Sequence, residues 1–110
     1  MTTESEILLL STTSTRAEAE SLGRLLIEKR FVACVNIIPH LMSIFLWEDS
    51  IATEEEVLLL MKSTMGRFED IEKFIKEHHS YSVPEIIAVP ILKGSREYLS
   101  WIHEMTSVTP

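Results

Sequence analysis

The chain has 110 residues, of which 45% are hydrophobic and 25% are charged, and this size and composition predict one compact domain over residues 1–110. Its 17 acidic residues outnumber the 10 lysines and arginines and give a formal net charge of −7, which argues against nucleic-acid binding because such binding depends on clustered cations. No apolar run approaches the roughly 20 residues that span a bilayer, and the acidic start lacks the basic region of a signal peptide, so we expect a cytoplasmic protein without a membrane partner.

The chain begins with a strand signal and a helix signal. The continuous apolar run at 6–12 is typical of a strand that is covered on both faces. Thr15 and Glu18 have the spacing of a capping box, in which a threonine oxygen and a glutamate three residues later satisfy free amides at a helix start. Leucines at helical spacing follow, so the sequence predicts a helix over 15–29.

A strand-rich segment follows the first helix. The β-branched run at 31–38 predicts a strand, and Pro39 interrupts it before another strand at 42–47. Polar residues at 48–50 predict a turn, and the apolar run at 56–63 predicts the next strand. We therefore expect three strands between the first and second helices.

The last part of the chain predicts a helix, a strand and a short helix. Apolar residues at helical spacing predict an amphipathic helix over 68–78. Pro84 forces the residue before it into extended backbone, and the apolar run at 85–91 predicts a strand. Gly94 and Ser95 then open a short helix whose apolar residues lie on one side.

The predicted order of elements is β-α-β-β-β-α-β-α. Two βαβ-like halves around a central hairpin favour an α+β fold of the ferredoxin-like split βαβ kind, with an antiparallel sheet. Several strands are apolar on both faces, although a small two-layer domain has helices on only one side of its sheet. The sequence therefore predicts that another subunit covers the second face and the exposed strand edges.

Four stretches of the sequence, taken together and in order, resemble one protein family. They are similar to the CutA family of divalent-cation tolerance proteins, and the resemblance extends from Ile7 to Trp101. It implies a ferredoxin-like fold that is assembled as a tight homotrimer, with clefts between neighbouring subunits. Asp49 stands where the family usually turns on a glycine, and aspartate tolerates the left-handed backbone. The four stretches are "ACVNIIP" at 33–39, "SIFLWED" at 43–49, "HHSYSVPEII" at 78–87 and "GSREYLSW" at 94–101.

The resemblance implies a metal site at the end of the second helix. His78 and His79 would bind copper or another divalent metal, with a cysteine from the end of the first strand in some members. Ser11 stands at that third position here, and a hydroxyl is a weaker ligand for copper or zinc than a thiolate. Adjacent helical residues diverge by about 100°, so both rings reach one ion only if the helix has ended. The alternative is that the two histidines only interact with the negative end of the helix dipole.

Aromatic and polar-tipped residues in the family-like stretches would line an inter-subunit cleft of the implied trimer. In such a cleft Lys62 would attract an anion and Glu85 a cation or an amine. The alternative is that these side chains pack in the core or at an interface. Cys34 lies between apolar strand residues, where a thiol behaves as a small buried hydrophobe. The candidate cleft residues are Trp47, Lys62, Tyr81, Glu85, Tyr98 and Trp101.

No catalytic motif accompanies these residues. The sequence has no G-x-S-x-G elbow, phosphate loop, H-E-x-x-H pair or Cys-x-x-Cys pair, so we do not expect an enzyme. The resemblance implies a trimer that binds a divalent metal ion, copper in particular, and acts in the response to metal ions. The alternative is a PII-like signalling trimer that binds a small metabolite in its inter-subunit clefts. A third interpretation is a structural trimer without a ligand.

Overall fold

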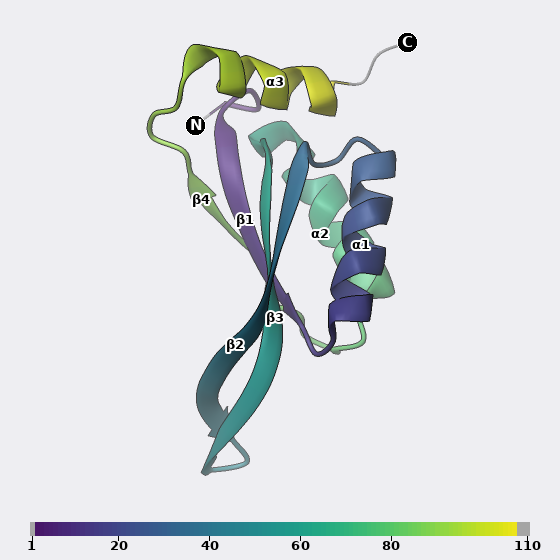
Figure 1. Ribbon diagram of the computed structural model, residues 1–110, viewed down its shortest axis with the longest axis vertical. Helices are drawn as coiled ribbons and strands as arrows, with labels where there is room; N and C mark the ends of the chain where they lie inside the picture. Colours follow the sequence, from purple (N-terminus) through teal and green to yellow (C-terminus); the bar gives the residue numbers. More distant parts are fainter. Residues whose placement is uncertain (1, 108–110) are drawn as a thin grey trace.

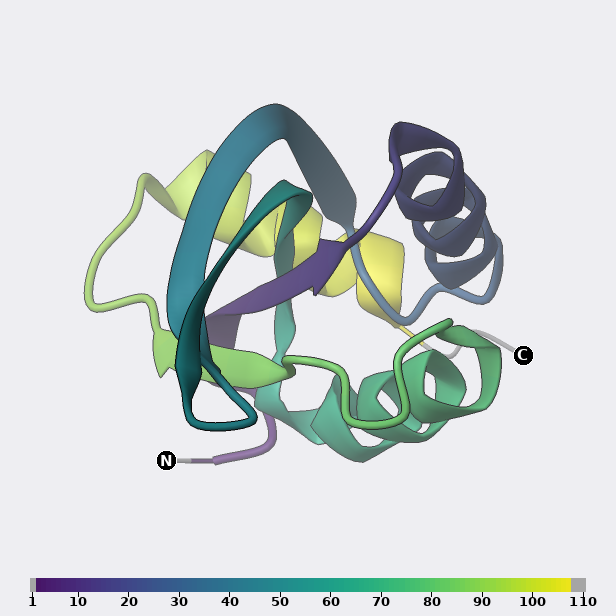
Figure 2. The same ribbon diagram turned by 90° about the horizontal axis from the view of Figure 1, so that it is seen from below.

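The structure is a computed structural model that describes residues 2–107. Its elements are β1 (Glu6–Thr13), α1 (Arg16–Glu28), β2 (Cys34–Trp47), β3 (Ser50–Thr64), a 3-10 turn (Met65–Arg67), α2 (Phe68–His78), β4 (Ile87–Pro90) and α3 (Arg96–Thr106). The four strands form one antiparallel sheet in the order β2-β3-β1-β4. Helices α1 and α2 lie on one side of this sheet, and α3 crosses one end of it (Figures 1 and 2). The arrangement is the predicted α+β fold of the split βαβ kind.

The face of the sheet under α1 and α2 forms the hydrophobic core. Leu9 of β1 lies opposite Met61 of β3, and both side chains are fully buried. Burying one leucine or isoleucine side chain stabilises a fold by about 1.5–3 kcal/mol, so this face is a main source of stability. We call it the covered face. Together with the inner sides of the helices it forms one core cluster, whose buried residues are Ile7, Leu9, Ala19, Leu22, Leu26, Val32, Val57, Leu59, Met61, Ile71, Phe74 and Ile75.

The opposite face of the sheet is also apolar, but α3 reaches it only at one end, where His103 contacts Glu6. Lys62 of β3 lies opposite Cys34 of β2 and Leu8 of β1, and alternate residues continue the same face. Thr12 and Thr64, at the two ends of this face, are buried, and the residues between them are not, which agrees with the prediction that one chain leaves one face without a helix layer. We call the following residues the open face: Leu8, Leu10, Cys34, Asn36, Ile38, Leu58, Leu60, Lys62, Ile87 and Val89.

The strands between the two long helices differ from the prediction. The two strands expected within 31–47 form the single strand β2, and β3 begins at Ser50 instead of Glu56. Pro39 does not end β2, because it falls at a register shift in an edge strand, and edge strands and bulges tolerate proline. The strand expected at 85–91 is shortened to β4. As a result, β2 and β3 extend beyond β1 as a long two-stranded arm, residues 41–56 (Figure 1).

The arm turns at Glu48 and Asp49. Their φ angles are 49° and 64°, and the flanking residues Trp47 and Ser50 are paired. Positive φ at both central residues is the geometry of the two-residue hairpin turn whose twist matches that of the strands. The left-handed backbone expected of Asp49 is therefore confirmed.

The predicted amphipathic helices are present. Thr15 caps α1, because its Oγ1 accepts a hydrogen bond from the Glu18 N–H at 3.1 Å. At the other end of α1, Arg30 has a φ of 59° and the Phe31 N–H donates to the Leu26 carbonyl at 3.1 Å, which closes the helix in a Schellman motif. None of the helices within residues 2–107 is both long enough and apolar enough to cross a membrane.

Candidate functional site

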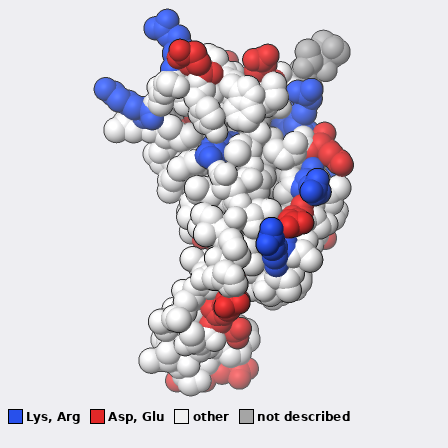
Figure 3. Space-filling view, in the orientation of Figure 1, with Lys and Arg blue, Asp and Glu red and all other residues white. Residues whose placement is uncertain are grey.

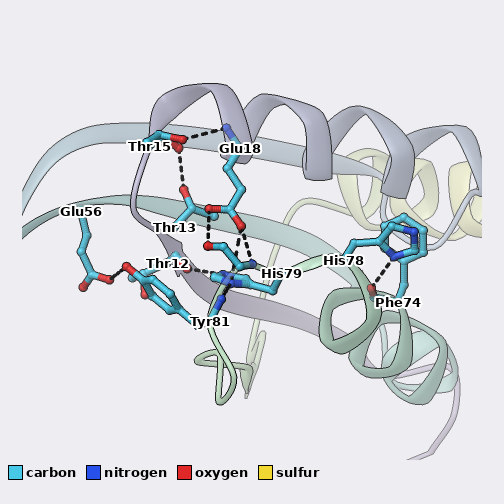
Figure 4. Close-up of polar contacts among 10 residues, drawn as sticks. Thr12, Thr13, Thr15, Glu18, Glu56, Phe74, His78, His79 and Tyr81 are labelled. Atoms are coloured by element: carbon cyan, nitrogen blue, oxygen red, sulfur yellow. Dashed lines mark hydrogen bonds and ion pairs between the residues drawn. The ribbon is translucent and has the colours of Figure 1, made fainter.

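The two adjacent histidines lie where α2 ends. His78 is the last helical residue, and His79 has extended backbone with φ of −83° and ψ of 145°. The helix therefore stops between the two side chains, as a shared metal ion would require. Figure 4 shows, however, that the two rings point in different directions: His78 lies against Phe74, and His79 points toward Thr12.

His78 folds back on its own helix. Its ring stacks on that of Phe74, with the centroids 4.1 Å apart, and its Nδ1 lies 2.9 Å from the Phe74 carbonyl oxygen. Because a carbonyl oxygen only accepts, Nδ1 carries the proton in this contact. The residue is exposed, and in this tautomer Nε2 carries the lone pair. This helix-end contact is the alternative role that the sequence suggested for the histidines.

His79 is bound through both ring nitrogens. Its side chain is 0% exposed, Nε2 lies 2.7 Å from the Thr12 carbonyl oxygen, and the Tyr81 N–H donates to Nδ1 at 2.9 Å. The carbonyl can only accept and the amide can only donate, so the ring is the neutral tautomer with its proton on Nε2. Both nitrogens are therefore occupied by the protein itself.

Glu18 ties the next residue of the loop to α1. Its two carboxylate oxygens accept the Ser80 N–H at 2.8 Å and the Ser80 hydroxyl at 3.0 Å. The capping-box prediction is thus half correct: Thr15 caps the Glu18 amide, while the Glu18 carboxylate binds the loop after α2 instead of the helix start. The carboxylate also lies 3.6 Å from the His79 Nδ1.

Tyr81 connects the same loop to the base of the arm. Its hydroxyl donates to the Glu56 carboxylate at 2.7 Å, and its ring lies 4.7 Å from that of His79. Burial raises the pKa of the Tyr81 hydroxyl well above its usual value, and the hydrogen bond and negative charge of Glu56 raise it further. We call residues 79–81 the clasp, because successive residues bind β1, α1 and β3 (Figure 4).

The third predicted metal position is buried in the core. Ser11 is 1% exposed on β1, and its Oγ has no hydrogen-bond partner among residues 2–107. Within the same residues, no three His, Cys, Asp or Glu side chains gather so that they could hold a metal ion. Because His79 has no free nitrogen, the predicted set of His78, His79 and Ser11 does not fit a three-ligand metal centre within one chain.

The predicted cleft residues lie in five separate parts of the chain. Tyr98 and Trp101 lie together on α3, with ring centroids 5.5 Å apart, whereas Trp47 lies at the end of the arm and Lys62 on the open face. Glu85 is exposed in the segment before β4. Cys34, expected to be buried, is half-buried. Tyr81, in the clasp, contacts the metal candidate His79, but within residues 2–107 the six cleft candidates do not gather into one site.

Sequence reasoning did not identify Thr12, Glu18, Ser80 and Glu56 as partners of the candidate residues. The contacts of His79 with Thr12 and of Ser80 with Glu18 join residues 67 and 62 positions apart. One of the partners of His79 is a backbone carbonyl, whose position no side-chain motif reports. The clasp therefore arises from the tertiary fold alone.

Comparisons with known proteins place this architecture in a family. A family model described as "CutA1 divalent ion tolerance protein" matches residues 7–105. The chain belongs to the CutA1 family. It is 42% identical over 101 residues to the divalent-cation tolerance protein CutA of Thermus thermophilus, and the aligned residues cover 92% of this chain and 98% of that protein. It is 38% identical over 88 residues to protein CutA of Mus musculus, which covers 80% of this chain and 50% of the mouse protein.

The fold agrees with the CutA1 assignment. The solved structure of the divalent cation tolerance protein from Thermus thermophilus matches with a TM-score of 0.90 and 41% sequence identity, covering 93% of this chain and 99% of that one. The resemblance found in four short stretches of sequence is therefore confirmed over nearly the whole chain. As the names of its CutA relatives state, the family is associated with divalent-cation tolerance.

Proposed function

We propose that this protein acts in divalent-cation tolerance as a cytoplasmic homotrimer that contacts copper weakly through His78 and catalyses no reaction. Membership of the CutA1 family is the observation that carries the link to divalent cations. The trimer is supported separately, by the apolar surface that one chain leaves uncovered. The two parts of the proposal can therefore be tested independently.

The arm supports assembly with further copies of the chain. Met42, Ile44, Leu46 and Ile51 are between 66% and 76% exposed, and they add to the half-buried apolar residues of the open face. Monomeric soluble proteins seldom expose contiguous apolar patches of this extent. Two neighbouring copies could shield both regions of each chain, as a closed ring of subunits does.

The charges of the arm support the same arrangement. The arm contains five acidic residues but no lysine or arginine: Glu48, Asp49, Glu54, Glu55 and Glu56. Figure 3 shows its acidic atoms at the bottom of the molecule, while the basic atoms lie over the body and α3. Lys93 and Arg96 are exposed beside the start of α3. An acidic arm that meets the basic end of another copy is electrostatically favourable. Such a head-to-tail contact is one that can close into a ring.

The assembly is tested by measuring the mass of the wild-type protein at micromolar concentration with light scattering after size-exclusion chromatography. We expect the mass of three chains. A folded monomer of one chain mass would contradict the trimer, while leaving the family assignment intact.

The metal contact is tested by calorimetric titration of copper into three histidine variants. His78 offers the free Nε2, so His78→Ala is expected to abolish most of the binding heat. His79→Ala removes a buried ring whose nitrogens are already bonded, so it should lower the melting temperature but keep copper binding. His40→Ala is the matched control, because His40 is an exposed histidine near the arm. Binding by His78→Ala that equals wild type would exclude this residue as the ligand.

A further inference from the structure

Lys62 is the one charged residue among the residues that define the open face, and Glu6 and Glu56 continue the same side of the sheet at its two ends. It lies in the middle of a row across the sheet, opposite Cys34 on one side and Leu8 on the other. Leu60 follows it on the same face of β3, and Val89 continues the row beyond Leu8. The lysine ammonium therefore lies among apolar side chains, and its polar neighbours on the open face are the Cys34 thiol and the Asn36 amide.

The neighbours of Lys62 do not neutralise its charge. Its Nζ donates to the Asn36 Oδ1 and lies 4.0 Å from the Cys34 Sγ. No carboxylate among residues 2–107 lies within ion-pair distance of it. Asn36 and Cys34 offer dipoles, and neither supplies the full negative charge that a covered ammonium requires.

The two carboxylates at the ends of the same face are bound elsewhere. The Glu6 carboxylate lies 2.6 Å from the His103 Nε2 under α3, and that of Glu56 accepts the Tyr81 hydroxyl at 2.7 Å. Moving either toward Lys62 would break a partly buried hydrogen bond to a charged group, which is unfavourable. The chain therefore has no carboxylate of its own that is free to pair with this lysine from the open face.

We propose that Lys62 and Asn36 form a binding site for an oxyanion, a carboxylate or phosphate group that comes from outside the subunit. This inference rests on the proposed trimer, because burying the open face removes the water that now solvates the ammonium. The bond from Lys62 fixes the amide of Asn36 with Oδ1 toward the lysine, so its NH₂ group is available to donate to the same oxyanion. The Lys62 ammonium supplies the positive charge that attracts the oxyanion, and the Asn36 NH₂ group orients the oxyanion through a hydrogen bond.

The oxyanion can come from two sources that share this chemistry. It is either a free anion held at the interface or a carboxylate of a neighbouring copy. A free anion makes the melting temperature rise with anion concentration, as for any ligand that binds only the folded assembly. If the oxyanion is instead a carboxylate of another copy, the assembly depends on Lys62 but the melting temperature does not rise with anion concentration.

The experiment measures melting temperature and oligomeric mass in inorganic phosphate and in chloride of equal ionic strength. Four proteins are compared: wild type, Lys62→Met, Lys62→Arg and the control Lys73→Met. Lys73 is exposed on α2, so its removal changes the net charge equally but leaves the open face intact. Methionine keeps the length and apolar stem of lysine, and arginine keeps the charge.

Each outcome decides between these sources or rejects both. A rise of several degrees in phosphate for wild type and Lys73→Met, absent in Lys62→Met, identifies a free oxyanion. No phosphate effect, with a trimer lost in Lys62→Met and retained in Lys62→Arg, identifies a carboxylate of the neighbouring copy. A Lys62→Met trimer as stable as wild type, with no phosphate effect on either, overturns the proposal. A monomeric wild type would reject the trimer. In that case the effect of phosphate on the melting temperatures of wild type and Lys62→Met alone decides whether Lys62 binds an oxyanion.

Discussion

Leu58 and Leu59 are consecutive residues of β3 with opposite surroundings. Leu59 points into the covered face and is 1% exposed, whereas Leu58 belongs to the open face and is only half-buried. Both faces consist largely of leucine, isoleucine and valine, so the hydrophobic pattern does not distinguish them. What differs is the layer above them, because α1 and α2 cover one side only (Figure 2). Apolar composition therefore predicts that a face will be covered, but not whether its own chain covers it.

Placing a charge on the open face is the strongest test of this difference. Leu58→Glu introduces a carboxylate that a neighbouring copy would bury without a partner, which disfavours association strongly. We expect the variant to keep its helical circular dichroism and to elute at the mass of one chain. Lys73→Glu, on the exposed side of α2, is the control and should remain trimeric. A trimeric Leu58→Glu would mean that the open face is not the interface.

Removing a side chain from the covered face tests the other half of the comparison. Leu59→Ala leaves a cavity in the core and is expected to lower the free energy of unfolding by about 2–5 kcal/mol. Urea unfolding followed by circular dichroism measures this loss, and it should persist at every protein concentration. Leu58→Ala should affect mainly the concentration at which the assembly dissociates. Equal losses in both variants at high dilution would remove the distinction between the two faces.

The adjacent histidines repeat the comparison on a smaller scale. His79→Ala leaves the Thr12 carbonyl and the Tyr81 N–H without a buried partner, so we expect the free energy of unfolding to fall by about 1–3 kcal/mol. His78→Ala removes one hydrogen bond at the surface, for which about 0.5–1 kcal/mol is expected. Chemical unfolding of both variants without metal gives the two values. A larger loss for His78→Ala would contradict the assignment of His79 to the clasp.

Tyr81 is expected to give the smallest effect, which appears only at alkaline pH. Folding raises the pKa of its hydroxyl, while a tyrosine in the unfolded chain ionises near pH 10. Below about pH 10 both states keep the proton and the full contribution is present. At higher pH the unfolded chain releases its proton first, so the free energy of unfolding falls.

Unfolding of Tyr81→Phe between about pH 9 and 11 tests this linkage, and its stability should decline less steeply than that of wild type. Tyr98→Phe is the matched control, because Tyr98 is 40% exposed on α3 and should not change the slope. Identical slopes for wild type and Tyr81→Phe would show that the contact with Glu56 does not protect the hydroxyl.

The parts of the fold that depend on local pattern were predictable from the sequence. Helical spacing gave the range of α2, and Thr15 marked the start of α1. The arm was not predicted at full length, because Pro39 and the acidic residues before Val57 resemble strand breaks. They are tolerated since β2 lies at the edge of the sheet and the arm extends into solvent, where polar side chains need no burial.

The candidate site was predictable only as a set of residue types. The sequence placed His78 and His79 at a helix end, and the structure confirms that position. It could not assign their separate roles, because the ring of His79 is held by a carbonyl of β1 and an amide of the loop. Those groups are brought to the ring by packing, which leaves no periodic signal in the sequence.

The acidic tip of the arm also bears on how the arms of two chains can approach each other. A long hairpin with exposed apolar strands invites open-ended stacking into fibres. Glu48 and Asp49 at the turn, with Glu54 and Glu55 behind them, oppose such growth because two arms that approach end to end bring like charges together. We therefore expect the hairpin tip to act as a gatekeeper against end-to-end aggregation.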